Sequence, residues 1–236
     1  MKKILFLIIA ATTIYSCKKD QDTSALDIGY GYFPNQSGKY IIYDVDSIVK
    51  NSFTKQVDTF KFQVKEVIES VFNDNTGRPT LRLERYRKYY SKTVAYDSMS
   101  WVLTDVWSAN LTSTSAEKVE ENVRYVRLIF PVEKYKTWNG NAYNTIGEWN
   151  YKYTEIDKAK TVGGIAFDST LTVVQFEDEN LIDKKYYREM YAKNVGLIYR
   201  QIIDVHSDSI QTAVPIMNRV TSGIIKYTAT INKFGG

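Results

Sequence analysis

The segment Phe60-Lys61-Phe62-Gln63-Val64-Lys65 decides the fold class, because every second residue in it is apolar. Successive side chains of a β-strand point to opposite faces of the sheet, so Phe60, Phe62 and Val64 are predicted to share one face. The alternation is interrupted at Glu66-Val67-Ile68, and we interpret the interruption as a β-bulge. The pattern is typical of a strand with one buried face.

The same two-residue period extends outward along most of the chain. Ile41, Tyr43 and Val45 alternate with polar residues in the preceding apolar segment. Further strands are predicted at residues 80–89, 100–109, 149–153, 171–176, 186–192, 197–205 and 224–231. Turns are predicted at 73–77 and 194–196, because Asn, Asp and Gly tolerate positive φ. The chain is therefore expected to be mainly β, as one antiparallel domain built as a meander, an open barrel or a sandwich.

Residues 116–127 fit two structures. Val119, Val123 and Val126 recur at helical spacing, with charged residues on the opposite face. As a strand the segment also works, since Val119 and Val123 share parity with Tyr125. The β-branched and aromatic residues that follow favour a strand.

The first sixteen residues are predicted to be a cleaved signal peptide. The basic start Met1-Lys2-Lys3 is followed by an apolar run from Ile4 to Ala11. A membrane-spanning helix needs about 20 apolar residues, and this run is too short and ends in polar residues.

Ile14-Tyr15-Ser16-Cys17 resembles a bacterial lipobox, in which cleavage falls between Ser16 and Cys17 and the cysteine carries acyl chains such as palmitate. Cys17 is the only cysteine in the chain. Residues 17–27 are polar and are expected to form a flexible tether to a domain at 28–236. Several acyl chains hold a protein stably at a membrane, so the membrane is an expected partner, through the lipid anchor.

Composition excludes several kinds of chemistry. One cysteine and one histidine exclude metal sites that need several thiolates or imidazoles, and no cofactor is predicted. His206, the only imidazole, lies among turn residues and is not expected to be catalytic. The mature chain has 29 basic and 27 acidic side chains, a net charge of +2, which argues against nucleic acid as a partner. A glycoside-hydrolase pair of carboxylates stays open, because such a pair is spatial. The glutamates on predicted strands, expected to cover the wet face, are Glu66, Glu69, Glu84, Glu120, Glu121 and Glu148.

Aromatic residues are the stronger indication of binding. Trp138 and Tyr143 lie in a stretch rich in Asn and Gly, which is expected to be a loop. An aromatic side chain on a polar loop is expected to be exposed, and exposed aromatic residues mark binding sites. Both are therefore candidate ligand contacts, although tyrosine and tryptophan also fill cores.

Two short motifs resemble a family of Bacteroidota envelope lipoproteins. Tyr32-Phe33-Pro34, followed by Gly38-Lys39-Tyr40, is similar to the start of their mature domain, and the segment 191–199 is similar to their closing hairpin. Ser16-Cys17-Lys18-Lys19-Asp20 is similar to the start of such lipoproteins. The resemblance implies a β-rich lipoprotein anchored in the outer membrane, on its periplasmic face or at the cell surface. It brings no assigned chemistry.

Four Asp-Ser dipeptides, each followed by an apolar residue or threonine, resemble the O-glycan acceptor pattern of Bacteroidota envelope proteins. The candidate serines are Ser47, Ser98, Ser169 and Ser209. The alternative is turn chemistry, since Asp and Ser also begin turns.

Together, the sequence favours a non-enzymatic envelope lipoprotein that binds or assembles, with an envelope protein or a glycan as partner. A glycan hydrolase with paired carboxylates and a lipid carrier with a β-rich cavity are the alternatives.

Overall fold

The computed structural model describes residues 27–236, which form twelve strands and three short 3₁₀ helices. The predicted signal peptide, Ser16, Cys17 and all but the last residue of the tether lie outside the described residues. The 3₁₀ helices are η1 (Tyr30–Tyr32), η2 (Tyr96–Ser98) and η3 (Ile216–Asn218). The strands are β1 (Tyr40–Lys50), β2 (Val57–Asn73), β3 (Pro79–Tyr89), β4 (Val102–Leu111), β5 (Ser115–Glu120), β6 (Val123–Ile129), β7 (Thr137–Asn139), β8 (Asn150–Val162), β9 (Ile165–Glu179), β10 (Asp183–Ala192), β11 (Gly196–His206) and β12 (Ser222–Gly235).

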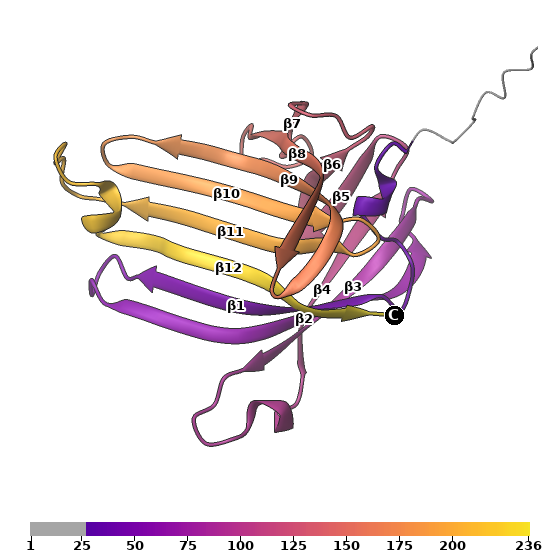
Figure 1. The fold of residues 1–236 in the computed structure, drawn as a ribbon, viewed down its shortest axis with the longest axis horizontal. Coiled ribbons are helices and arrows are strands. Elements are labelled where there is room, and N and C mark those ends of the chain that lie inside the picture. Colours follow the sequence, from indigo (N-terminus) through magenta and orange to yellow (C-terminus); the bar gives the residue numbers. More distant parts are fainter. Residues whose placement is uncertain (1–26) are drawn as a thin grey trace, which may run out of the picture.

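All twelve strands belong to one antiparallel sheet, in the order β6-β5-β4-β3-β2-β1-β12-β11-β10-β9-β8-β7. Strands that follow one another along the chain are neighbours in the sheet, except β6 and β7, which are its two edge strands. The first and last strands, β1 and β12, also pair, which brings the domain's two ends together. The sheet curls until its outer strands approach, and Val126 N donates to Gly140 O at 2.9 Å across the gap (Figure 1). The predicted antiparallel β-rich domain is confirmed, as a nearly closed, barrel-like meander.

In strand β2, Phe60, Phe62 and Val64 share one face of the sheet, as their alternation predicts. Val64 lies opposite Tyr43, Phe62 opposite Val45 and Phe60 opposite Ser47 in the β1–β2 ladder. Directly opposed residues of antiparallel strands point to the same side of the sheet. Tyr43, Val45 and Val64 are buried and form one core cluster, so this side is the interior.

The predicted bulge at Glu66-Val67-Ile68 is wrong. The β1–β2 ladder continues without a register shift through Glu66, which lies opposite Ile41. Glu66 is therefore in phase with Val64 and with the buried Ile68, and it faces the interior. The register shift of β2 comes later, between Ile68 and Ser70, in its ladder with β3. The apparent break in the apolar alternation is therefore Glu66, whose carboxylate faces the interior.

Residues 116–127 are neither a helix nor one strand. They fold into the β5–β6 hairpin, whose turn residues Glu121 and Asn122 both have positive φ, 49° and 63°. Two such residues match the right-handed twist of a tight hairpin. The preference for β structure is confirmed, but the turn was not predicted.

Successive turns of the meander lie at alternate ends of the barrel. The turns β1–β2, β3–β4, β9–β10 and β11–β12 lie at one end, which we call the distal end, and the turns β2–β3, β8–β9 and β10–β11 lie at the other, the proximal end. The chain enters and leaves at the proximal end, where Asp27 pairs with Lys193 (Figure 1). A tether attached at residue 27 therefore starts at the proximal end.

The two motifs that carry the family resemblance contact each other there. Asn194 N donates to Gly31 O at 2.7 Å. Gly196 has a φ of +100°, and a Cβ on it would lie 3.0 Å from Pro34 Cδ, so the close approach depends on glycine. Segments about 160 residues apart thus form one structural unit that covers the proximal end.

Candidate functional site

The barrel interior holds a cluster of charged side chains from both halves of the sheet. Arg200 on β11 lies 3.1 Å from Glu120 on β5 and 2.6 Å from Glu189 on β10. Arg127 on β6 lies 2.8 Å from Glu120. We call the whole set the interior ion cluster; its members are Glu66, Arg85, Lys118, Glu120, Arg127, Glu189 and Arg200.

The carboxylates of this cluster stay ionised. Burial alone would raise the pKa of Glu120, but the charges of Arg127, Arg200 and Lys118 outweigh it and hold the pKa well below its usual value. The pKa of Glu189 is lowered in the same way, against the effect of burial, by Arg200 and Arg127. Glycoside hydrolysis needs one carboxyl group with a raised pKa as general acid. Glu120 and Glu189 both have lowered pKa values instead.

The expectation that the strand glutamates cover the wet face is wrong for Glu66 and Glu120. Both face the interior, where Lys118 Nζ donates to Glu66 at 2.8 Å. A buried carboxylate needs such partners because isolated charges are costly to desolvate. No sequence pattern predicted this pairing, because the partners lie on strands far apart in the chain.

An aromatic pocket lies against the ion cluster, on its distal side. Its volume is about 180 Å³, far above the 10–15 Å³ that one buried water needs. Glu120, Arg127 and Arg200 form its base, and Asn141 and Ile146 of the β7–β8 connection also line it. The walls of this interior pocket are Tyr125, Trp149, Tyr151, Gln175, Tyr187 and Ile202.

Two residues that line the pocket each carry a buried side-chain nitrogen with no hydrogen-bond partner among the described residues. These nitrogens are Gln175 Nε2 and Arg127 Nε, in side chains whose residues are 4% and 6% exposed. A buried donor left unpaired costs about 1–3 kcal/mol. A bound ligand that supplied a hydrogen-bond acceptor to each donor would remove this cost.

The tyrosines around these donors are neutral hydroxyl groups at ordinary pH. Burial raises the pKa of Tyr151 to about 12. Burial and the hydrogen bond from its hydroxyl to Asp204, at 2.5 Å, raise the pKa of Tyr187. Trp149 stacks against Tyr187 and Phe176, with ring centroids 4.9 and 4.7 Å apart. The pocket therefore combines rigid aromatic faces with free donors.

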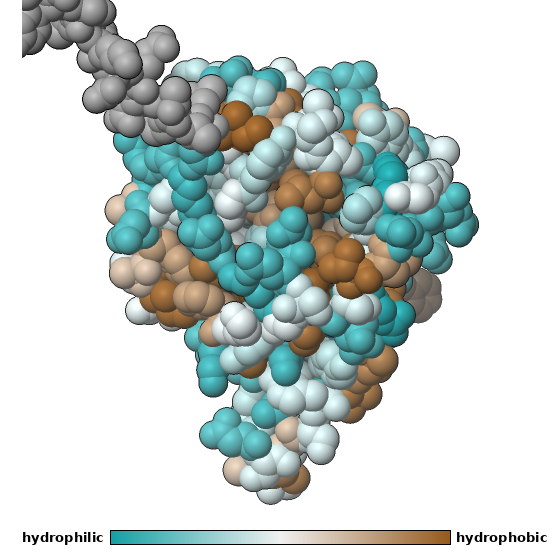
Figure 2. Space-filling view, turned by 90° about the vertical axis from the view of Figure 1, so that its right-hand side faces the viewer, coloured by the Kyte–Doolittle hydropathy of each residue, from teal (hydrophilic) through white to brown (hydrophobic). Residues whose placement is uncertain are grey.

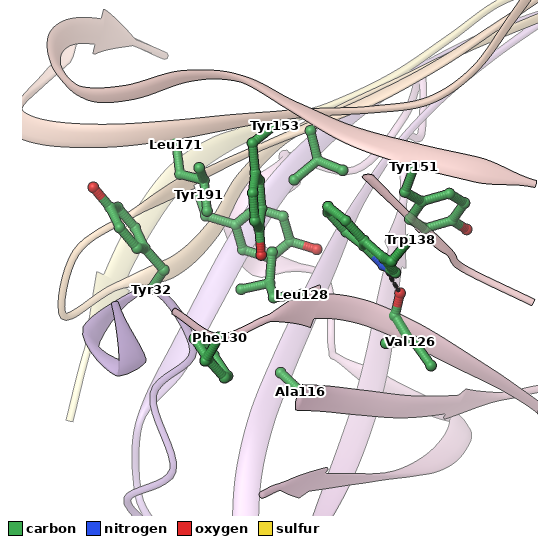
Figure 3. Close-up of a cluster of buried hydrophobic side chains, with 11 residues drawn as sticks. Tyr32, Ala116, Val126, Leu128, Phe130, Trp138, Tyr151, Tyr153, Leu171 and Tyr191 are labelled. Atoms are coloured by element: carbon green, nitrogen blue, oxygen red, sulfur yellow. Dashed lines mark hydrogen bonds between the residues drawn. The ribbon is translucent and has the colours of Figure 1, made fainter. Parts of the chain in front are cut away.

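The predicted exposure of Trp138 is wrong. Trp138 is 8% exposed, its Nε1 donates to Val126 O at 2.9 Å, and its ring packs 4.5 Å from that of Tyr153 (Figure 3). The residue belongs to strand β7, which was hidden in the polar stretch, and it fills the core between the outer strands of the sheet. It is not placed to touch a ligand from the surface.

Tyr143 is 61% exposed, and its role as a ligand contact stays a prediction. Of the polar stretch 138–144 that contains it, Asn141 lines the interior pocket. The tryptophan in the pocket wall is Trp149, which the alternation with Tyr151 and Tyr153 predicts only as a strand residue.

The four candidate glycosylation serines differ in accessibility. Ser47 is 9% exposed and faces the interior in the middle of β1. Ser169 is half-buried, and its hydroxyl donates to Asp157. Ser98 is exposed and Ser209 is half-buried, both in distal connections. Glycosylation of the four serines stays a prediction.

His206 is held between two carboxylates. Its Nδ1 lies 2.8 Å from Asp183 and its Nε2 lies 3.6 Å from Asp208. A serine nucleophile would need one of these ring nitrogens as its base. In the described part of the chain, no cluster of three or more His, Cys, Asp or Glu side chains is arranged to hold a metal ion.

A second pocket opens on the proximal side of the ion cluster. It has a volume of about 70 Å³ and apolar walls that include Phe33, Ile68 and Leu197, while Lys118 and Arg200 of the cluster form part of its lining. Viewed from this end, the surface shows apolar residues in separate patches among hydrophilic ones (Figure 2). The charged cluster thus interrupts the interior, which is not the continuous apolar cavity expected of a lipid carrier.

Within residues 27–236, no helix has the length and apolar character required to cross a membrane.

No protein-family model matches this chain, and no curated protein matches it. Among solved structures, a protein of Bacteroides fragilis described as exported, with a YmcC-like fold, aligns over 86% of this chain and 98% of its own, with a TM-score of 0.42 and 8% identity. A protein of Parabacteroides distasonis described as a lipoprotein aligns over the same shares, with a TM-score of 0.42 and 9% identity. With so few identical residues, the likeness concerns the course of the chain and no individual side chain.

Proposed function

We propose that this protein is a lipid-anchored envelope lipoprotein of the outer membrane, and that its domain binds a saccharide in the interior pocket without transforming it. The observation that carries the proposal is the pair of buried, unpaired donors, Gln175 Nε2 and Arg127 Nε, between aromatic walls. A sugar ring has C–H faces that lie against aromatic rings and hydroxyl groups that accept from such donors.

The charges of the pocket support a ligand that is polar but uncharged at this point. Glu120 and Glu189 balance Arg127 and Arg200, so the base of the pocket offers no unpaired full charge. An acyl chain would leave both donors unpaired, at the cost that makes buried polar groups rare without partners. Hydrolysis lacks support, because the pKa values of Glu120 and Glu189 are lowered by the neighbouring arginines and not raised.

The interior pocket is tested by Gln175→Leu, which keeps the size of the side chain and removes the donor. We expect this variant to bind saccharide at least tenfold more weakly than the wild type, a loss of about 1.4 kcal/mol. Trp149→Ala should weaken binding by a similar factor, because it removes one aromatic wall. The measurement is titration calorimetry with the best binder from a panel of linear gluco-, N-acetylgluco- and uronic-acid oligosaccharides.

The matched control is Gln63→Leu, since Gln63 lies outside the pocket and bonds Asp44 on β1. It should bind like the wild type. If no member of the panel binds the wild type, or if Gln175→Leu and Trp149→Ala bind like Gln63→Leu, the proposed function is wrong.

The anchor is tested by Cys17→Ala in the full chain. Because the cysteine thiol is the attachment point of the acyl chains, the variant should move from the membrane pellet to the soluble fraction after cell lysis. Ser24→Ala in the same tether is the control and should stay in the pellet. A Cys17→Ala protein that remains with the membranes would contradict the anchor.

A further inference from the structure

A row of mostly aromatic side chains crosses the inner face of the sheet at its distal half. Ser47 lies opposite Phe60 on one side and Tyr227 on the other; Tyr227 lies opposite Ile202, Ile202 opposite Tyr187, and Tyr187 opposite Phe176. Directly opposed residues share a face, so the six side chains form one row over β2, β1, β12, β11, β10 and β9. Five strand spacings make the row about 24 Å long.

One end of this row is the interior pocket. Ile202 and Tyr187 are among its walls, and Phe176 stacks on Trp149. The row is therefore a continuation of the pocket along the sheet, away from the ion cluster.

The other end of the row is an open groove with a volume of about 580 Å³. Phe60 and Tyr89 are 53% and 52% exposed there, and Phe62 and Tyr89 face each other with ring centroids 6.0 Å apart. Ser47 belongs to this groove and to the row at once. Large aromatic side chains that stay exposed on a concave surface indicate a binding surface.

Two cations that line the groove, Lys61 and Arg87, have no ion-pair partner among residues 27–236, and Arg87 is the one on the inner face beside the aromatic rings. Arg87 lines the groove, lies 5.4 Å from the ring of Phe62, and has no ion-pair partner among residues 27–236. Its Nε atom is buried without a hydrogen-bond partner there. A guanidinium in this state recognises a carboxylate, with charge-assisted hydrogen bonds.

We infer that the ligand is a linear glycan of several units that lies along the aromatic row, with one unit in the interior pocket and an acidic unit at Arg87. The inference rests on the proposed function and specifies its ligand. Donors without a partner at both ends of the row, Gln175 and Arg127 at one end and Arg87 at the other, favour a ligand with acceptors at both of its ends. An acyl chain of the same length has none.

The test compares linear oligosaccharides of two and six units, in neutral and uronic-acid forms, by titration calorimetry. The wild type should bind the six-unit chain at least tenfold more tightly than the two-unit chain. A long chain held in the interior pocket reaches the groove intramolecularly, whereas a short chain does not. Phe60→Ala and Tyr89→Ala should reduce binding of the long chain to within twofold of the short chain, and leave the short chain unchanged. Arg87→Gln should remove the preference for the uronic form.

The control is Tyr135→Ala, since Tyr135 is 69% exposed in the β6–β7 connection and outside the row. Equal affinity of the wild type for short and long chains overturns the inference and leaves the interior pocket standing, whereas absence of binding for every saccharide removes the proposed function as well. Palmitate that binds the wild type, is lost in Phe60→Ala and is not displaced by the six-unit chain would also overturn the inference, in favour of a lipid.

Discussion

Replacing Arg200 with methionine is expected to destabilise the domain by about 3–5 kcal/mol, because it removes one of the two arginines that Glu120 and Glu189 share in the buried cluster. The side chain of Glu189 is fully buried, so water cannot replace the guanidinium. Arg127, 3.6 Å away, is then the only cation that pairs with Glu189 among the described residues, while Glu120 keeps Arg127 at 2.8 Å and Lys118 at 3.8 Å. Equilibrium unfolding in urea measures the change in the free energy of unfolding.

The control for this variant is Arg82→Met. Arg82 also pairs with two carboxylates, Glu69 and Glu84, but its side chain is 42% exposed. Ion pairs at the surface contribute about 0–1 kcal/mol, so this change should have little effect. Equal losses for the two variants would show that the interior ion cluster does not stabilise the barrel.

Lowering the pH should destabilise the wild-type domain through the same interior ion cluster. Because the folded-state pKa values of Glu120 and Glu189 lie below the ordinary value of 4.5, the ionised carboxylates stabilise the fold above about pH 4.5. This contribution is lost as the pH falls from there through the folded-state pKa values. In Arg200→Met the cluster no longer lowers these pKa values as far, so its stability should fall less steeply in the same acid range.

Trp138→Ala is expected to cost about 3–5 kcal/mol in the free energy of unfolding, as large-to-small changes of buried aromatic residues do. The indole fills the core beside Tyr151 and Tyr153 and donates its N–H to Val126 O, so the variant loses packing and leaves a carbonyl unpaired. Because β7 and β6 meet there, the seam of the barrel should loosen first. Urea unfolding gives the loss, and hydrogen exchange of β6 and β7 amides gives its location.

Tyr143→Ala is the control, because Tyr143 comes from the same polar stretch and is 61% exposed. Surface changes of this kind usually stay within about 0.5 kcal/mol. A Trp138→Ala domain as stable as the Tyr143→Ala domain would mean that the indole is not a core residue, and the original interpretation of Trp138 as an exposed contact would return.

Local patterns predicted the strands because a strand's burial repeats every two residues whatever lies around it. The segment predicted at 80–89 became β3 almost at its predicted limits, and the segment from Phe60 to Lys65 lies inside the longer strand β2. The same reasoning failed at Glu66, because a charge in an apolar row looks like a break when its partners are unknown. It failed at Trp138 because three residues of β7 are too few to show a period.

By itself the sequence determined the β class and the antiparallel connections, since both depend on neighbouring residues alone. The tertiary structure decided which charges and aromatic rings meet. Arg200 reaches Glu120 across 80 positions, and Phe60 joins Tyr227 and Tyr187 in one row only because β1 pairs with β12. Pairing between distant strands depends on the closure of the whole sheet, and no local period encodes it.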